Sequence, residues 1–359
     1  MTAGLVLAST GDKYTDSYNY SYVGSKMSED AEVRNKDGVG IVISGHEQIK
    51  PQKDPYDTYA VLEFNRGKNF FNHYQFEAAI QNFKEAEAKL DDGELKDLAK
   101  FYIKLVNFYQ KWDKFNDRIE IYNEKLDKIE SFKLPSYFYK EIIQKCPNEL
   151  LNNDFDNSEE FINQLNNNLE FLRLKIQNNQ KEAMKYYLPD LLNNAHRKIE
   201  EGFFDDAVAR LYRAIELIAQ VSLNIHDLID VEKFKNHKVF HINRKQFKTQ
   251  TKFDPEIPKM VQNWNIKEYE DRDKTFKVPK DKSYKILEAF GEDLAKKYFA
   301  DERLKNAVNK RNDSILAHGL NPMNKKDAED LYNRVLYYSK FFWVDIEKYM
   351  KMAEFPKFK

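Results

Sequence analysis

Cysteine, glycine and proline are scarce in this chain. Cys146 is the single cysteine among 359 residues, so neither an internal disulfide nor a cysteine-based zinc site can form within it. A reducing cytoplasm is the simplest compartment for such a protein. With only 11 glycines and 10 prolines, the chain has few turn signals, and we expect long helices to dominate.

Long apolar runs and an excess of one charge are also missing. No stretch approaches the ~18 apolar residues of a membrane-spanning helix, and the N-terminus lacks the basic region of a signal peptide. Lys and Arg number 58 against 59 Asp and Glu, which gives a formal charge of −1. This balance excludes a globally basic nucleic-acid-binding protein but leaves room for a local basic patch.

The hydrophobic pattern changes along the chain and predicts three domains. Residues 1–52 hold short apolar runs (4–8, 18–23 and 39–43) between glycines, which is typical of small α/β elements. Residues 53–185 and 186–359 have helical spacing instead. The predicted fold class is therefore mainly α, with a small N-terminal α/β segment, a helical connector domain and a C-terminal helical bundle.

The helical spacing also predicts individual helices, and a segment between them that is irregular. A helical hairpin is expected over residues 59–90, and residues 230–283 are rich in lysine and expected to be irregular. Single helices are predicted over residues 95–112, 117–129, 161–176, 191–200, 203–223, 284–299, 301–318 and 325–352. The helix over 203–223 has the clearest apolar side, formed by Ala207, Leu211, Ile215, Ile218 and Leu223.

The segment 311–319, Arg-Asn-Asp-Ser-Ile-Leu-Ala-His-Gly, carries the sharpest chemical signal. On a helix over 301–318, Arg311 and His318 project from one face about 10 Å apart along the axis. His318 would precede Gly319 at the helix C-terminus, where the helix dipole favours a protonated imidazole. An imidazole suits general acid–base catalysis, and a guanidinium suits a phosphate. With the neutral Asn312 beside them, these residues predict metal-independent RNA cleavage by the substrate's 2′-hydroxyl.

The same residues have a plainer interpretation. Arg311 can be a solvated charge on a helix surface, and His318 can simply cap a helix end. The two interpretations differ in geometry: a nuclease needs both side chains in a polar cleft, whereas a scaffold would bury or cap His318 elsewhere.

Polar residues on the helix over 203–223 can support this pair. Arg213, Glu216 and Gln220 form a stripe at positions i, i+3 and i+7. In a functional interpretation, Arg213 or Glu216 holds the catalytic Arg311 and His318 in place. In a structural one, the stripe is an ion-pair ladder on the helix surface.

A basic, aromatic segment follows at residues 233–252. It has no acidic residue between Glu232 and Asp254, and phenylalanines at 234, 240, 247 and 253 interleave with its cations. Charges for phosphates and π-faces for bases are what single-stranded RNA binding needs. The candidate RNA-binding residues are Lys235, Lys238, Arg244, Lys245 and Lys248. The alternative is a solvated loop whose phenylalanines are part of the core.

Other chemical motifs are incomplete. His237 and His241 are four residues apart, as zinc ligands can be, but no cysteine or well-placed carboxylate completes a set. We therefore predict no metal site. The chain also lacks a phosphate-binding loop of the G-x(4)-G-K-[ST] type and a G-x-S-x-G nucleophile motif.

The RN-x5-HG segment, together with the helix over residues 207–219, resembles the HEPN ribonuclease domain. More narrowly, it resembles the CARF–HEPN ribonucleases of type III CRISPR systems. The resemblance implies that Arg311 and His318 are the active-site pair of the R-x(4–6)-H motif and that Asn312 is the polar residue after the Arg. It also implies a homodimer whose composite site cleaves single-stranded RNA in antiviral defence. It covers residues 186–359 well and the helical middle region more loosely.

The N-terminus resembles the last part of a CARF sensor domain over residues 2–8, 20–24 and 38–45. In that family the domain is a Rossmann-like sheet that binds cyclic oligoadenylate, so the resemblance implies this activator and no other cofactor. The larger N-terminal part of the sensor is expected to be absent or supplied by another chain. Two other functions stay open: a non-catalytic helical interaction protein, and a HEPN toxin ribonuclease held silent by an antitoxin.

Overall fold

A computed structural model of the chain describes residues 21–24, 48–51, 59–123, 127–147, 158–177, 179–250, 274–314 and 319–359. The chain divides into two compact units, Met1–Asn107 and Phe108–Lys359. The division falls inside helix α4 (Glu94–Asp113), which the sequence predicted over 95–112. The predicted domain boundaries after residues 52 and 185 stay predictions.

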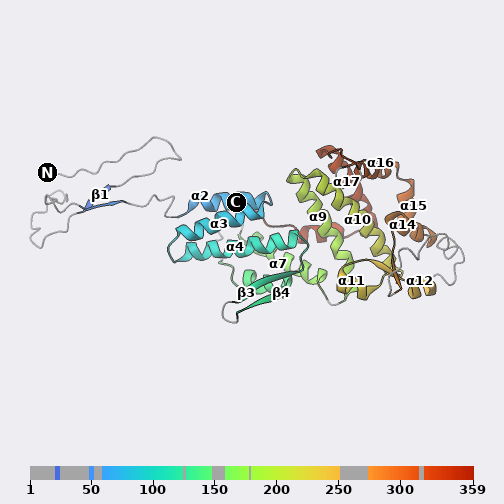
Figure 1. Ribbon diagram of the computed structural model, residues 1–359, viewed down its shortest axis with the longest axis horizontal. Coiled ribbons are helices and arrows are strands. Elements are labelled where there is room, and N and C mark those ends of the chain that lie inside the picture. The colour runs from blue at the N-terminus through green and yellow to red at the C-terminus, as the bar shows by residue number, and fades with distance from the viewer. Residues whose placement is uncertain are drawn as a thin grey trace, which may run out of the picture. The chain divides into compact units, whose positions relative to one another are not determined.

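The first unit contains the predicted helical hairpin, formed by α2 (Val61–Asn72) and α3 (Phe76–Lys89) (Figure 1). The two helices pack closely because Gly67 faces the ring of Phe83, where an added Cβ would lie 2.6 Å from a ring carbon. Two strands, β1 (Ser21–Gly24) and β2 (Gln48–Pro51), pair antiparallel earlier in this unit. The apolar runs predicted at 4–8 and 39–43 lie outside the described residues.

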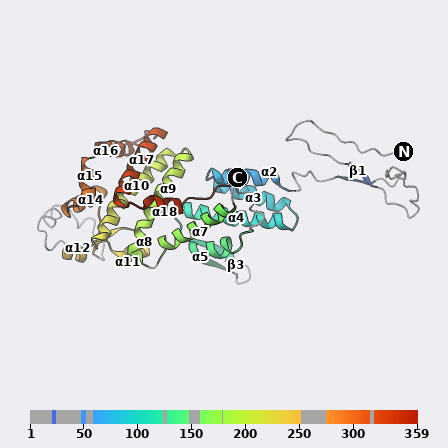
Figure 2. The same ribbon diagram turned by 180° about the vertical axis from the view of Figure 1, so that it is seen from behind.

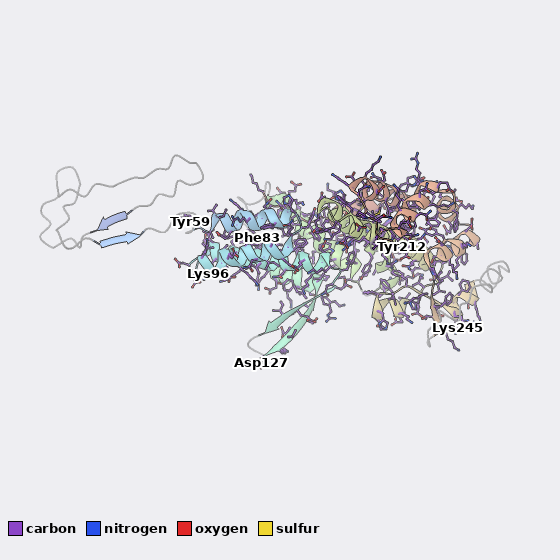
Figure 3. All side chains as sticks on the ribbon, turned by 45° about the horizontal axis from the view of Figure 1, so that its top comes forward. Tyr59, Phe83, Lys96, Asp127, Tyr212 and Lys245 are labelled. Carbon is purple, nitrogen blue, oxygen red and sulfur yellow. The ribbon has the colours of Figure 1, made fainter. Side chains whose placement is uncertain are left out.

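The second unit begins with a β-hairpin, where the sequence predicted a helix over 117–129. Strand β3 (Arg118–Asn123) pairs antiparallel with β4 (Lys128–Lys133), so that prediction was wrong. In Arg118-Ile-Glu-Ile the apolar and charged residues alternate, and this period of two fits a strand. Figure 3 labels Asp127 beside the end of this hairpin.

Short helices and one long helix connect the hairpin to the C-terminal bundle. The long helix is α7 (Ser158–Lys175), close to the predicted 161–176. The short ones are α5 (Leu134–Tyr137), the π-helix η1 (Phe138–Ile143), α8 (Gln180–Ala183) and the 3-10 turn η2 (Met184–Tyr186). Figure 2 shows α7 beside α18 (Ile346–Met352), where the side chain of Asn168 donates to the backbone oxygens of Met352 and Glu354 at 2.7 and 2.9 Å.

The bundle is built around α10 (Phe204–Ile225), which packs against α9 (Tyr187–Glu200) and α17 (Lys325–Phe342) (Figures 1 and 2). The predicted apolar side of α10 is confirmed. Its residues are buried: Ala207, Leu211, Ile215, Ile218 and Leu223. Because apolar residues recur at helical spacing on this long helix, they form the centre of the second unit's core.

Three further helices line α10 and α17: α14 (Lys280–Ala289), α15 (Asp293–Ala300) and α16 (Glu302–Asn312). The segment predicted to be irregular over 230–283 is partly ordered. It contains α11 (Val231–His237), β5 (His241–Asn243), α12 (Arg244–Gln250) and β6 (Thr275–Lys277), and β5 pairs antiparallel with β6. Residues 251–273 lie outside the described part.

Three predicted helices are shorter than the sequence suggested. The helix over 284–299 is two helices, α14 and α15, because Gly291 has a φ of +83° at the turn between them. The helix over 325–352 is α17 and α18, since the backbone at Trp343 is extended. The helix over 301–318 ends at Asn312. Mainly helical structure is nevertheless confirmed, with three two-stranded sheets among the described residues.

No helix in the described part of the chain combines the length and apolar character needed to cross a membrane.

Candidate active site

Helix α16 carries Arg311 and Asn312 in its last turn. At its start, the Asp301 side chain accepts a hydrogen bond from the Leu304 N–H at 3.0 Å and caps the helix. Leu304 and Val308 are buried in the bundle. Arg311 is the next residue on that same stripe, three positions after Val308, so the helix directs this arginine toward the bundle.

The guanidinium of Arg311 lies over the ring of Tyr212 on α10, with 4.4 Å between its Cζ and the ring centroid. Figure 3 shows Tyr212 among the side chains of the second unit. Arg311 is half-buried, and its Nη1 donates to the Oδ1 of Asn312 at 3.5 Å. It has no ion pair with a carboxylate of the described residues, and its Nε is buried there with no hydrogen-bond partner. Arg311 is therefore not a solvated surface charge.

The two predicted supporting residues lie next to Tyr212 on α10. Arg213 Nη1 is 3.5 Å from Glu216 Oε2, and the Arg213 guanidinium lies 5.5 Å from the ring centroid of Phe240. Burial raises the pKa of Glu216, against the positive charges of Arg213, Lys280 and Arg311. The structure thus brings Glu216 within the electrostatic range of Arg311.

Burial favours the neutral form of each titratable group in this cluster. It lowers the pKa of Arg213 and, with the charge of Glu216, raises the pKa of Tyr212. One more buried atom on α10, Gln220 Oε1, lacks a hydrogen-bond partner among the described residues, and Arg213 Nη1 has only its 3.5 Å ion pair with Glu216. The cluster therefore has unused hydrogen-bonding capacity in a partly dehydrated place.

Sequence reasoning missed three residues beside this cluster. Lys280 is buried at the start of α14, 2.6 Å from Asp281 Oδ1, and its Nζ lies 5.5 Å from the Tyr212 ring centroid. Tyr298 donates to Asp281 at 2.6 Å. Burial acts to raise the pKa of Asp281, but hydrogen bonds from Lys280 and Tyr298 lower it overall. No periodic pattern marks these residues, since they come from helices distant from Arg311 in sequence.

His318 lies outside the described residues, but the residues that flank it are placed. The Gly319 N–H donates to the Ser314 oxygen at 3.2 Å, and the Asn321 N–H donates to the Asp313 oxygen at 3.3 Å. A Cβ at Gly319 would lie 2.0 Å from the Asp313 oxygen. Gly319 therefore allows a close return of the chain to Asp313, and the prediction that one helix carries both Arg311 and His318 was wrong.

The described phenylalanines of the basic segment are part of the core, whereas the sequence predicted that they stack on RNA bases. Phe234 and Phe247 are buried in the core, and Phe240 is partly buried against it. These rings cannot stack on bases, so this part of the prediction was wrong. The cause is helical: α11 and α12 each turn phenylalanine inward and lysine outward.

The cations of that segment differ in exposure. Lys235, Lys245 and Lys248 are exposed, and Figure 3 labels Lys245 on α12, whereas Arg244 is half-buried. Lys238 is engaged, since its Nζ donates to Gln180 Oε1 at 3.1 Å and lies 5.0 Å from the Phe234 ring centroid. Three exposed lysines thus stay candidates for phosphate contacts.

The histidines at 237 and 241 do not converge. His241 is buried, and its Nδ1 lies 3.2 Å from Thr275 Oγ1, while His237 is exposed at the end of α11. Among the residues that the structure describes, no group of three or more His, Cys, Asp or Glu side chains could hold a metal ion.

Comparison with known protein families agrees with the geometry of the bundle. Residues 176–342 match the family model of the Csm6 HEPN domain. The matched range holds Arg311, Asn312 and His318, together with α10, whose Tyr212 contacts Arg311, and the helices α14, α15 and α16. No curated protein matches the chain. The resemblance to the CRISPR-associated HEPN family is thereby confirmed over residues 176–342.

Proposed function

We propose that this protein is a metal-independent endonuclease that cleaves single-stranded RNA in type III CRISPR antiviral defence. The match to the Csm6 HEPN domain supports a nuclease of the CRISPR-associated HEPN family. The observation that carries the proposal is the state of Arg311: half-buried, held on Tyr212 and not neutralised by a described carboxylate. A guanidinium in that state is suited to bind a phosphodiester.

Arg311 binds the scissile phosphate and stabilises the extra negative charge that develops in the transition state. The ring face of Tyr212 favours the cation and restricts its position. Arg213 and Lys280 add positive charge close by, while Glu216 offsets part of it and helps to position Arg311. The cluster thus supplies, from side chains, the positive potential that phosphate chemistry needs.

His318 acts as the general base and acid, and Asn312 orients the phosphate or the imidazole. The base removes the proton of the 2′-hydroxyl, whose oxygen forms a bond to phosphorus. The bond between phosphorus and the 5′-oxygen breaks, and that oxygen takes a proton. The products are a 2′,3′-cyclic phosphate and a 5′-hydroxyl, with no water consumed.

Other parts of the proposal rest on the family. Two protomers form a homodimer in which both motifs meet in one composite site, and cyclic oligoadenylate binding to residues 1–52 or to a partner sensor activates it. Residues 53–185 connect this sensor segment to the nuclease domain at 186–359. The exposed Lys235, Lys245 and Lys248, with Lys238 and Arg244 near them, attract the RNA backbone.

The test is cleavage of end-labelled single-stranded RNA by Arg311→Ala and His318→Ala variants, with and without cyclic oligoadenylates. We expect each variant to lose about 10²–10³-fold in rate, as enzymes do when they lose a transition-state charge contact. Lys305→Ala is the matched control, since Lys305 is an exposed cation on the same helix. A single-stranded oligonucleotide of the same sequence with 2′-deoxyribose at every position should not be cut, because it lacks the attacking 2′-hydroxyl. Equal rates for wild type and both variants would refute the site.

A further inference from the structure

A second polar feature lies between α16 and α17 and has no role in the chemistry above. It is a pocket of about 520 Å³, to which α16 contributes Arg303, Asn306 and Lys310 and α17 contributes Asp327, Asp330, Asn333 and Arg334. The three α16 residues have spacings of three and four, so one face of that helix forms one wall. Its volume is in the range of small-ligand sites, about 300–1,000 Å³.

Two of the pocket's cations are held in place by partners. Lys310 Nζ is 2.7 Å from Asp327 Oδ1. Arg334 pairs through its Nε with the buried Asp301, and its guanidinium lies 4.8 Å from the Tyr337 ring centroid. These contacts fix two positive charges at the pocket without burying them completely.

Four other polar side chains of the pocket have no such partner. Within the described part of the chain, Arg303, Asn306, Asn333 and the acidic Asp330 make no side-chain hydrogen bond or ion pair. Their donors and acceptors converge from two helices on one cavity. A guanidinium can bind a phosphate, and each amide offers both a donor and an acceptor to a base edge.

We infer that this pocket binds one nucleotide of the single-stranded RNA, next to the phosphodiester that is cleaved. Lys310 directly precedes Arg311 on α16, so the pocket lies at the same level of the helix as the proposed catalytic arginine, whose side chain projects about 100° further round the axis. The inference rests on the proposed function for its substrate. A second protein copy fits the pocket less well, because protein interfaces are depleted in charged residues such as Lys and Asp at their core.

The test measures binding of fluorescein-labelled RNA with 2′-O-methyl riboses to the full chain by fluorescence polarisation. This RNA lacks the attacking hydroxyl, so it reports binding without cleavage. We expect the pocket variant Arg303→Ala/Asn306→Ala to raise Kd about tenfold, as the loss of one or two charge-assisted hydrogen bonds should. The matched control Lys305→Ala/Asn309→Ala removes one cation and one amide from exposed positions of α16 outside the pocket, and its Kd should change less than about twofold.

A second pocket variant keeps the test informative if the double-alanine variant does not fold. Asn306→Asp keeps the shape of an exposed side chain and adds a negative charge, so it should weaken RNA binding without lowering the midpoint of urea unfolding. Wild-type affinity in both pocket variants would overturn the inference. A second outcome would also overturn the inference: both pocket variants become monomers by light scattering, while each monomer binds RNA with wild-type affinity. The pocket would then hold a second copy of the protein.

The outcome separates this inference from the proposed function. If Arg311→Ala abolishes cleavage and the pocket variants bind RNA normally, only the pocket assignment fails. If the pocket variants bind RNA weakly and Arg311→Ala cleaves normally, only the catalytic assignment fails.

Discussion

Two buried polar clusters of the second unit differ in how completely their hydrogen bonds are made. Around Asp190 on α9, the Trp112 Nε1 donates to Oδ1 at 2.9 Å and the Lys175 Nζ donates to Oδ2 at 2.7 Å. Both carboxylate oxygens and the buried cation have partners. Around Arg311, the buried Arg311 Nε has no hydrogen-bond partner among the described residues.

We interpret the difference as one between a structural cluster and a candidate functional one. A paired, buried ion pair helps to fix the packing of three helices, and it leaves nothing for a ligand to bind. An unpaired buried donor costs about 1–3 kcal/mol of stability, and a bound phosphate that accepts its hydrogen bond removes that cost. Both clusters contain an arginine or lysine on an aromatic ring. What distinguishes them is the central group: Asp190 and Lys175 are hydrogen-bonded to each other, whereas Arg311 Nε has no partner among the described residues. Asp117 Oδ1, 3.8 Å from Lys175 Nζ, also lacks a hydrogen bond there.

The largest effect on stability is expected at the paired cluster. Asp190→Ala leaves Lys175, which is 1% exposed, without its nearest counter-charge. We expect a loss of about 3–5 kcal/mol in the free energy of unfolding, measured by urea titration. Trp112→Phe, which removes one hydrogen bond and keeps an aromatic ring, should cost less. A loss below about 1 kcal/mol for Asp190→Ala would mean that the cluster does not hold the helices together.

A second paired carboxylate, Asp301, sharpens the comparison through pH. Burial acts to raise its pKa, but hydrogen bonds from Arg334, the Leu304 N–H and Tyr338 lower the pKa of Asp301 overall. Because the folded pKa lies below the unfolded value of about 3.9, its stabilisation is present above that value and disappears as the pH falls through the folded pKa.

Asp301→Asn should therefore destabilise the protein by about 2 kcal/mol at pH 7, with a smaller difference from wild type at pH 3. Melting temperatures of both proteins between pH 7 and pH 3 test this. A difference that grows toward low pH would contradict the direction of the shift.

The ring under Arg311 should influence catalysis more than folding. Tyr212→Leu removes the ring that lies 4.4 Å from the guanidinium, and a partly buried cation–π contact contributes about 1–2 kcal/mol. We expect RNA cleavage to fall about tenfold, and Tyr212→Phe to stay within about threefold of wild type. Equal loss in both variants would show that the hydroxyl group, rather than the ring, is what matters.

The exposed lysines of α12 should give the smallest effects. Lys245→Ala/Lys248→Ala should lower RNA affinity only a few-fold and reduce the slope of log affinity against log salt by about 1–2. The free energy of unfolding of this double variant should differ from that of wild type by less than about 0.5 kcal/mol. An unchanged salt slope would exclude these lysines from the RNA path.

The sequence predicted the parts of the fold that depend on long periodic patterns. The apolar stripe of α10 follows from its spacing alone, and the motif at Arg311 was sufficient to propose a site there. The end of α16 at Asn312 could not be predicted, because it depends on the close contact of Gly319 with Asp313. Tyr212 and Lys280 were missed because only folding brings α10 and α14 to Arg311.

The basic segment shows a second limit of sequence patterns. Alternating cations and phenylalanines suit both RNA stacking and an amphipathic helix, and composition does not distinguish them. The burial of Phe234 and Phe247 decides for the helix. In the same way, the four-residue alternation at the start of β3 was too short to outweigh the helical spacing around it.

The most direct test of the account measures stability and cleavage on one preparation of Arg311→Gln. If the cluster around Arg311 is a site rather than a structural support, the unfolding free energy should stay within about 1 kcal/mol of wild type while RNA cleavage falls at least about 100-fold. A variant that unfolds far more easily yet cleaves RNA at the wild-type rate per folded molecule would contradict it.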